Sequence, residues 1–369
     1  MGAICLAGAL LSPMANAADE DSLEAALQAQ MAPMVADGFS GAVLVADADG
    51  LVFERYYGRI DPDKAASIDA DTRFNLASSG KLFTTVAILQ LVESGKLDLD
   101  VPVGRYLPDW PNATVREQVT ARQLLMHTSG LGQFWGAEFE AVRGRLQTLS
   151  DYQPLLTADP DFTPGSQWSY SNNGYMLLGL LIEAISGEDY YHYIQAHVFD
   201  PAGMSGAGYF EIDGQAPDVA VPYRASADGV ERLTMPEPRG GPAGGGYARP
   251  RDLLAFHRAL TGGKLLKSAT LDLLFAPVKL PDSAKAPPHG LGMLRFAAGE
   301  DVGYGHPGGA PGIGVNFRGA LRGGWMILLI SNRDRAPLMP LGHAIATAIA
   351  EHGGVDLRTP MPPRRPQPR

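Results

Sequence analysis

A serine and a lysine stand three residues apart at Ser78 and Lys81, where a long apolar run begins. If this run is helical, positions three apart share one face, so the hydroxyl and the amine can touch. A serine hydroxyl is a weak nucleophile at neutral pH and needs a base within hydrogen-bond reach. A desolvated lysine loses part of its charge and can accept that proton. The pair therefore predicts an activated serine, although Ser-x-x-Lys alone is a common pattern.

Three other elements carry polar groups that could join the pair. Tyr170-Ser171-Asn172 precedes an apolar helical stretch, so it offers a phenol and an amide from a loop, while Ser171 or Asn172 could equally serve as a helix cap. His306-Pro307-Gly308-Gly309 falls between two C-terminal strand patterns, where the simpler interpretation is a glycine-rich hairpin with an incidental histidine. The stretch 124–131 has the form of a helix C-terminus, with His127 placed to meet the last carbonyl groups.

The elements that must position these groups follow from the apolar pattern. Residues 41–46 and 51–56 flank Asp49-Gly50, which is a strong hairpin signal, and the run 78–94 is apolar on every side, as in a buried helix. Further helices are expected at 21–36, 120–127, 173–186, 250–260 and 338–351, and further strands at 290–296, 312–318 and 324–331. This order predicts an α+β fold: an antiparallel sheet built from N- and C-terminal strands and flanked by helices, with an inserted, mostly helical domain.

The composition shifts along the chain predict its domain limits. We expect a sheet domain formed by residues 19–97 and 262–356, a helical domain at 98–261, and a disordered tail rich in Pro and Arg at 357–369. Residues 1–18 have the form of a signal peptide, with an apolar stretch followed by the small-x-small motif Ala15-Asn16-Ala17. The single cysteine, Cys5, lies inside this segment, so no disulfide is expected in the mature chain. The expected location is secreted or periplasmic.

The composition also excludes several classes of function. Of the 369 residues, 45% are hydrophobic and 19% charged, which predicts a sizeable core. The net charge of −10 argues against a nucleic-acid partner, and no apolar run after the signal segment is long enough for a membrane span. The chain has neither Gly-x-Ser-x-Gly nor His-Glu-x-x-His, and His192 and His197, five apart, would face different directions on a helix. No metal or cofactor is expected.

Taken together, the motifs resemble those of the serine β-lactamase and penicillin-binding protein superfamily, within it the branch of class C β-lactamases, D-aminopeptidases and family VIII carboxylesterases. The order along the chain matches: Ser-x-x-Lys at Ser78, Tyr-x-Asn at Tyr170, and a third motif at His306-Pro307-Gly308 on a late strand. The resemblance covers residues 38–350 and includes the supporting segments 74–77, 127–130, 199–204 and 242–247.

The resemblance implies a role for each matching position. Ser78 would be the acylated nucleophile, and Lys81 would accept or share its proton. Tyr170 would pass a proton to the leaving group and later activate water, while Asn172 would orient the substrate and the lysine. The backbone N–H groups of Ser78 and Gly309 would form the oxyanion hole. A glycine at 308 as well as at 309 would let the substrate lie flat against that strand.

The third motif departs from the class C pattern, which carries Lys-Thr-Gly, because this chain has no Lys-x-Gly. His306 is shorter, titrates near neutrality, and would offer less fixed positive charge to a substrate carboxylate. We therefore expect an exported serine hydrolase that acts on a small ester, amide or D-amino-acid peptide. The alternatives are a class C-type β-lactamase or DD-carboxypeptidase, and a non-catalytic module that holds cell-wall peptide. The oligomeric state is left open.

Overall fold

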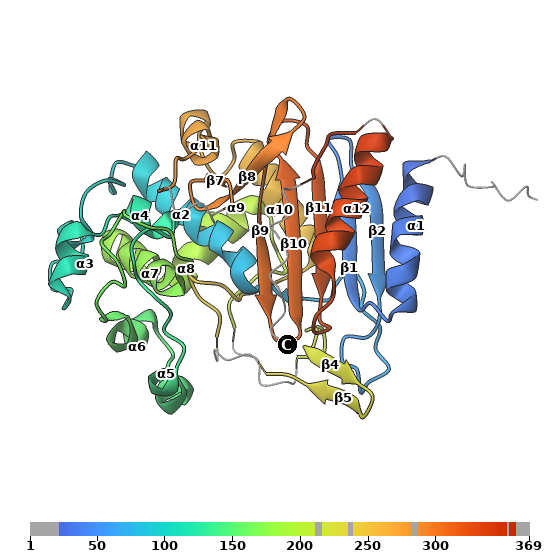
Figure 1. The fold of residues 1–369 in the computed structure, drawn as a ribbon, viewed down its shortest axis with the longest axis horizontal. Helices are drawn as coiled ribbons and strands as arrows, with labels where there is room; N and C mark the ends of the chain where they lie inside the picture. Colours follow the sequence, from blue (N-terminus) through green and yellow to red (C-terminus); the bar gives the residue numbers. More distant parts are fainter. Residues whose placement is uncertain (1–21, 211–215, 235–238, 282–286, 353, 359–369) are drawn as a thin grey trace, which may run out of the picture.

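A seven-stranded antiparallel sheet forms the centre of the molecule in a computed structural model, which describes residues 22–210, 216–234, 239–281, 287–352 and 354–358 (Figure 1). The strand order is β2-β1-β11-β10-β9-β8-β7, so the N-terminal hairpin pairs with the last strand of the chain. The strands are β1 (Gly41–Ala46), β2 (Leu51–Tyr57), β7 (His289–Gly290), β8 (Met293–Ala298), β9 (Asp301–Ala310), β10 (Ile313–Ala320) and β11 (Met326–Ser331). This arrangement confirms the α+β fold and the sheet built from both ends of the chain.

Helices cover both faces of this sheet, which is why β1 and β11 are buried along their whole length. On one face, α1 (Leu23–Ala36) and α12 (Leu338–Glu351) lie side by side and enclose a smaller core (Figure 1). On the other face, α10 (Pro250–Thr261) packs against β1 and β11 within the main core. A strand that is buried on both faces reads as a continuous apolar run, as Gly41–Ala46 does.

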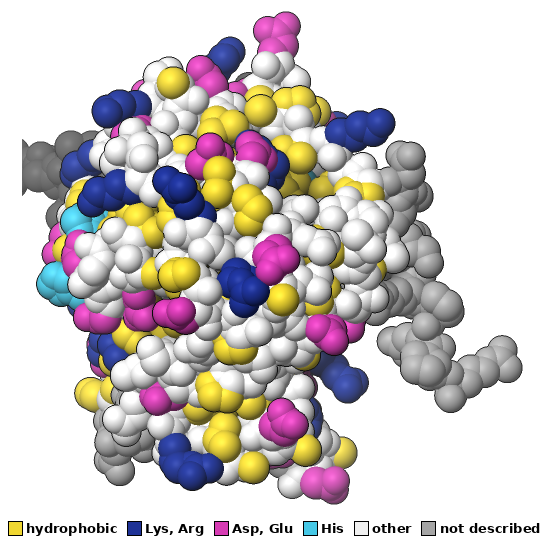
Figure 2. All heavy atoms as spheres, turned by 90° about the vertical axis from the view of Figure 1, so that its left-hand side faces the viewer, with side chains coloured by type: hydrophobic (Ala, Val, Ile, Leu, Met, Phe, Trp, Pro, Cys, Tyr) yellow, Lys and Arg dark blue, Asp and Glu magenta, His cyan; other side chains and the backbone are white. Residues whose placement is uncertain are grey.

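The remaining helices lie mainly in the middle of the sequence and extend from one side of the sheet (Figure 1). The helices are α2 (Lys81–Glu93), α3 (Ala113–Gln118), α4 (Ala121–Leu125), α5 (Ala137–Val142), α6 (Leu149–Tyr152), α7 (Asn172–Ser186), α8 (Tyr190–Ile194), α9 (Asp200–Ala202) and α11 (Ser268–Phe275). Short helical turns are η1 (Ala77–Gly80), η2 (Val103–Arg105), η3 (Arg143–Arg145), η4 (Gln153–Leu156) and the π-helical η5 (Gln195–Phe199). Acidic and basic side chains are interspersed over this helical end of the molecule (Figure 2).

Two pairs of short strands lie outside the main sheet. The strands β3 (Phe74–Asn75) and β6 (Tyr247–Ala248) pair with each other and so join the segment before Ser78 to the segment before α10. The strands β4 (Tyr223–Ser226) and β5 (Gly229–Arg232) form an exposed hairpin. Among the described residues, no helix combines the length and the apolar character that crossing a membrane would require.

The motif His306-Pro307-Gly308-Gly309 lies on a strand, as the family resemblance implied, and not in the hairpin turn that its composition alone suggests. All four residues belong to β9 and pair with β10, with His306 opposite Phe317 and Gly309 opposite Gly314. Strand β8 pairs with β9 only as far as Gly305, so the other edge of β9 carries no strand beyond that point. A proline is tolerated at such an edge because it has no N–H to donate to a neighbouring strand. The proline and glycines lower the strand propensity of this segment, and pairing with β10 stabilises the strand despite them.

Other boundaries differ from the expectations in informative ways. The signal segment lies outside the described residues, as do residues 359–369 of the expected tail. Leu357, which we placed in the tail, is fully buried, and its carbonyl accepts a hydrogen bond from the buried Arg318. The histidines at 192 and 197 do not face different directions, because the π-helical turn η5 brings both imidazoles to Glu188. No cluster of metal-ligating side chains occurs among the described residues.

Candidate active site

The backbone around Ser78 is held in a tight, strained turn. Ala77 has a positive φ of 43°, which an alanine rarely adopts. The Asn75 side chain accepts a hydrogen bond from the Ala77 N–H at 2.8 Å, and the Ala77 carbonyl accepts one from the Gly245 N–H at 2.9 Å. These bonds fix the turn from both sides. Strain that neighbouring contacts hold in place is typical of functional sites.

Only one of the two adjacent serines faces open space. Ser79 is 2% exposed, and its hydroxyl donates to the His306 carbonyl at 2.7 Å, which ties η1 to the edge of β9. Ser78 is half-buried and lines a cleft. The sequence alone left the choice between the two hydroxyls to the spacing from Lys81. The structure separates them by what each hydroxyl contacts.

Lys81 is fully buried at the start of α2 and donates toward three oxygens. Its Nζ lies 2.7 Å from Asn172 Oδ1 and 3.5 Å from Ser78 Oγ, and it also donates to the Ala243 carbonyl. The expected single helix 78–94 is instead the 3₁₀ turn η1 followed by α2. Residues three apart are nearly eclipsed in 3₁₀ geometry, so the tighter first turn aligns the lysine with the serine.

The Tyr170-Ser171-Asn172 motif lies where a loop enters α7. Ser171 is the helix cap, since its hydroxyl accepts from the Gly174 N–H at 2.8 Å. This leaves Tyr170 and Asn172 to point at Lys81, whose Nζ lies 4.9 Å from the centre of the Tyr170 ring. Both interpretations of the motif are therefore correct for different residues.

The Tyr170 hydroxyl is buried and makes no hydrogen bond of ordinary length with the described residues, and the side chain that acts on it is Ser78. Burial raises the pKa of Tyr170 to about 12, against a smaller lowering effect of the Ser78 hydroxyl. The phenol is therefore protonated at neutral pH. In this state it can donate a proton to a leaving group on a carbonyl carbon bonded to Ser78 Oγ.

Gln133 is a site residue that the sequence analysis missed. Its Nε2 donates to the Tyr170 carbonyl at 2.6 Å, and its Oε1 accepts from Asn172 Nδ2 at 2.5 Å. Because Asn172 gives its Oδ1 to Lys81, the glutamine fixes which way round that amide lies. Gln133 lies just after the segment 127–130, which carried part of the resemblance. No pattern in the neighbouring sequence predicts that its side chain contacts the Tyr-x-Asn motif.

Two histidines beside Tyr170 are buried and neutral, contrary to expectation. His306 is 7% exposed, and its Nδ1 lies 2.7 Å from the Pro307 carbonyl. Burial, reinforced by the positive charge of Lys81, lowers the pKa of His306 to about 3, so it does not titrate near neutrality. Burial likewise lowers the pKa of His127 well below its usual range. His127 accepts from the Ser171 N–H at 3.1 Å and does not serve the helix carbonyls.

Gly308 and Gly309 of the third motif are suited to glycine for different physical reasons. A Cβ at Gly308 would lie 2.4 Å from the Leu76 carbonyl, so glycine is needed there to let β9 approach η1. A Cβ at Gly309 would meet no atom within 4 Å, and Gly309 lines the cleft beside Ser78. Gly309 is therefore the glycine that leaves room for a substrate to lie flat against the strand. At Gly308 it is the packing of the strand against the serine turn that excludes a side chain.

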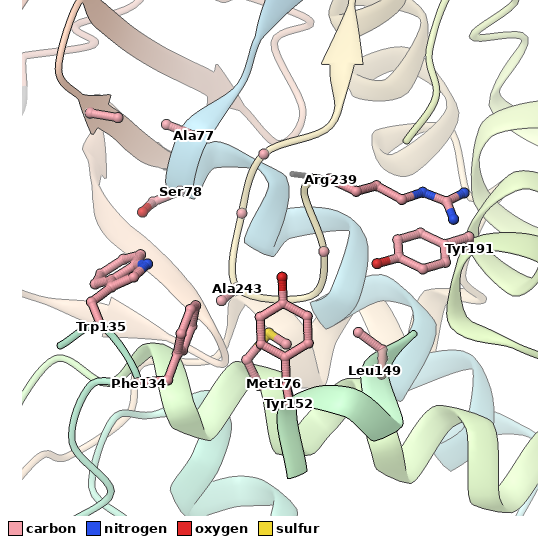
Figure 3. A pocket seen from close by; sticks show the side chains of 15 residues that line it. Ala77, Ser78, Phe134, Trp135, Leu149, Tyr152, Met176, Tyr191, Arg239 and Ala243 are labelled. Carbon is pink, nitrogen blue, oxygen red and sulfur yellow. The ribbon is translucent and has the colours of Figure 1, made fainter. Parts of the chain in front are cut away.

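The cleft itself encloses about 550 Å³, part of it open to solvent (Figure 3). Ser78 and Gly309 both line the cleft, together with a glycine loop, residues 240–246. Figure 3 shows this loop between Ser78 and Arg239. The sheet, the helical part and the half-buried serine beside a buried lysine together define the β-lactamase and penicillin-binding protein class of serine hydrolases. The chain belongs to the Beta-lactamase family, whose sequence model matches residues 23–351.

Relatives of this chain include both hydrolases and penicillin-binding proteins. Esterase EstB of Burkholderia gladioli is 30% identical over 333 residues, which cover 81% of this chain and 83% of the esterase. Penicillin-binding protein 4* of Bacillus subtilis (strain 168) is 30% identical over 292 residues, covering 74% of this chain and 64% of that protein.

Solved structures show the same fold. A penicillin-binding protein from Bacillus halodurans superposes with a TM-score of 0.74 at 28% identity, covering 88% of this chain and 99% of that protein. The D-amino acid amidase from Ochrobactrum anthropi SV3 superposes with a TM-score of 0.76 over 89% of this chain and 99% of the amidase. At 24% identity, the amidase supports the fold alone.

Proposed function

We propose that this protein is an exported serine hydrolase that cleaves esters or small amides through an acyl-enzyme on Ser78. The observation that carries the proposal is the meeting of three groups from distant parts of the chain. The Ser78 hydroxyl lies 3.5 Å from Lys81 Nζ, and it is the side chain that acts on the buried Tyr170 hydroxyl. A nucleophile flanked by two proton-carrying groups at the edge of a cleft supports acyl transfer.

The proposed reaction has two halves. Ser78 Oγ attacks the substrate carbonyl carbon while its proton passes to the uncharged amine of Lys81, from which it later replaces the proton that Tyr170 gives up. The N–H groups of Ser78 and Gly309 receive the developing oxyanion. Tyr170 then protonates the leaving alcohol or amine, which is consistent with its raised pKa. In the second half, water attacks the acyl-enzyme and gives a proton to Lys81. The same proton passes to Ser78 Oγ as the acid leaves, which restores the starting state.

Ester hydrolysis leads among the candidate reactions. The relationship to an esterase over most of both chains supports it. The neutral, buried His306 brings no positive charge to the place where the class C pattern has a lysine, which argues against efficient turnover of β-lactams. A D-amino-acid amide or peptide is the second candidate, supported by the likeness to a D-stereospecific amidohydrolase from Streptomyces sp., which superposes with a TM-score of 0.69 at 26% identity. Export rests on the signal-like sequence at residues 1–18 alone.

The test is labelling and turnover with matched serine variants. The wild type is expected to hydrolyse 4-nitrophenyl acetate and to gain a single fluorophosphonate adduct on the peptide that contains Ser78. Ser78→Ala should lose both. Ser79→Ala removes the neighbouring hydroxyl, which only ties η1 to β9, and should keep the adduct. Inertness of the folded wild type toward esters, D-alanyl peptides and nitrocefin would instead favour a cell-wall peptide-binding module.

A further inference from the structure

One wall of the cleft beside Ser78 is built from large apolar side chains. They come from the loop before α5, from α6 and from α7, and are Phe134, Trp135, Leu149, Tyr152 and Met176. Four of them are at most 5% exposed, whereas Trp135 is 43% exposed at the mouth of the cleft. A large aromatic side chain that stays exposed beside a buried apolar wall is typical of a surface that contacts a ligand.

The floor opposite this wall is flat backbone. In the glycine loop, Gly241 and Gly244 exchange N–H to carbonyl bonds of 2.7 and 3.0 Å, and a Cβ at Gly244 would lie 2.7 Å from the Ala77 carbonyl. Of the residues 241–245 that line the cleft, all are glycines except Ala243. A slot between peptide planes on one side and aromatic rings on the other suits a flat apolar group.

The end of the slot away from Ser78 carries a positive charge. Arg239 lies with its guanidinium 3.5 Å from the centre of the Tyr191 ring, and its Nε donates to the Tyr209 carbonyl at 3.1 Å (Figure 3). No carboxylate of the described part of the chain forms an ion pair with it. The carboxylates of Glu183, Asp189 and Asp151 also act electrostatically on Tyr191, with an effect opposite to that of Arg239.

The slot holds the acyl part of the substrate, given the positions of the proton-carrying groups. Neither Lys81 nor Tyr170 lines the cleft, although both adjoin Ser78. The leaving group must receive its proton from that side, so the group in the cleft is the one that stays bonded to the carbonyl carbon. This step rests on the function proposed above.

We propose that the enzyme selects acyl groups with a flat, apolar, aromatic body and an anionic end, which the aromatic wall and Arg239 bind respectively. An aromatic acyl group gains from leaving water in the slot. A carboxylate at its far end meets a guanidinium that is already oriented by Tyr191 and by the Tyr209 carbonyl, so little side-chain entropy is lost.

The experiment compares 4-nitrophenyl esters that share one leaving group. The acyl groups are acetyl, phenylacetyl, 4-carboxyphenylacetyl and its neutral 4-carbamoyl isostere, with a second carboxylate and carbamoyl pair lengthened by a three-carbon spacer. Relative to base-catalysed hydrolysis, we expect kcat/KM to rise roughly 20-fold from acetyl to phenylacetyl. For the better of the two lengths, we expect carboxylate to exceed carbamoyl roughly fivefold.

Ratios within one preparation separate the two parts of the site. Arg239→Gln should bring the carboxylate-to-carbamoyl ratio to about one, and Trp135→Ala should lower the phenylacetyl-to-acetyl ratio, while Arg322→Gln, a surface control, should keep both. A wild type that hydrolyses the acetyl ester without preferring the aryl acyl groups overturns the aromatic slot and leaves the hydrolase intact. A carboxylate-to-carbamoyl ratio near one at both lengths overturns the role of Arg239. If the folded wild type shows neither turnover nor labelling, the proposed hydrolase function itself is wrong.

Discussion

Acidification is expected to destabilise this protein through its buried neutral histidines. Burial lowers the pKa of His306 to about 3 and that of His257 to about 4. In the unfolded chain each has a pKa near 6.5, so below that pH the unfolded state binds protons that the folded state does not. The free energy of unfolding therefore falls as the pH falls from about 6.5 toward these lower values.

The size of the effect follows from the same numbers. Between about pH 7.5 and about pH 5, each of the two histidines removes about 2 kcal/mol, or about 4 kcal/mol together. The pKa values of His127 and His289 are also lowered by burial, so both add loss in the same direction. A domain of ordinary stability has about 5–15 kcal/mol, so this loss is a large fraction of the whole.

Urea unfolding followed by tryptophan fluorescence at the two pH values measures this loss. His257 is the variant of choice, because it lies under the sheet against Tyr304 and away from Ser78. His257→Gln should shrink the difference between the two pH values by about 2 kcal/mol, whatever it does to stability at neutral pH. His192→Gln makes the same substitution at an exposed histidine and serves as the control for the exchange itself. Equal wild-type stability at both pH values would refute the reasoning.

Two other sets of variants test the packing around the serine. Gln133→Ala leaves the Asn172 amide without its acceptor, and kcat/KM for 4-nitrophenyl acetate should fall about tenfold with the melting temperature little changed; full activity would contradict a positioning role. Gly308→Ala forces a methyl group against the Leu76 carbonyl and should cost about 1–3 kcal/mol in urea unfolding. Gly309→Ala meets no atom and should unfold like wild type, so equal losses in the two alanine variants would argue against the contact.

Local patterns were enough to predict much of the fold. The Asp49-Gly50 turn lies between β1 and β2 as expected, and the side chain of Asp47 accepts from both turn N–H groups at 2.9 Å. The apolar helices after Ser78 and Asn172 were predicted to within a few residues, because a helix buried on most sides leaves a strong signal in its own sequence. The contact between Ser78 and Lys81 followed from their spacing, whereas the approach of Tyr170 to this pair followed from the family resemblance alone.

What the sequence could not reveal depends on contacts between distant segments. The strand at His306 exists because β10 pairs with it, which outweighs the poor strand propensity of proline and glycine. The neutral state of His306 depends on its burial near Lys81, and a sequence carries no measure of burial for a single histidine. Gln133 contacts Asn172 although the two residues are 39 apart in the sequence, so only the folded structure brings them together.

The glycine loop contacts both Lys81 and the proposed acyl slot. Lys81 and Thr84 lie one turn apart on α2 and donate to two successive carbonyls of that loop, those of Ala243 and Pro242. The Thr84 hydroxyl also lies 2.8 Å from the Tyr190 hydroxyl, and burial raises the pKa of Tyr190 well above its usual range, so the phenol stays protonated and the network is intact at every pH of interest. The same backbone that forms the floor of the slot thus holds the amine beside Ser78. An acyl group that displaces the glycine loop would also displace Lys81. We therefore expect acyl groups that fit the slot poorly to acylate Ser78 more slowly.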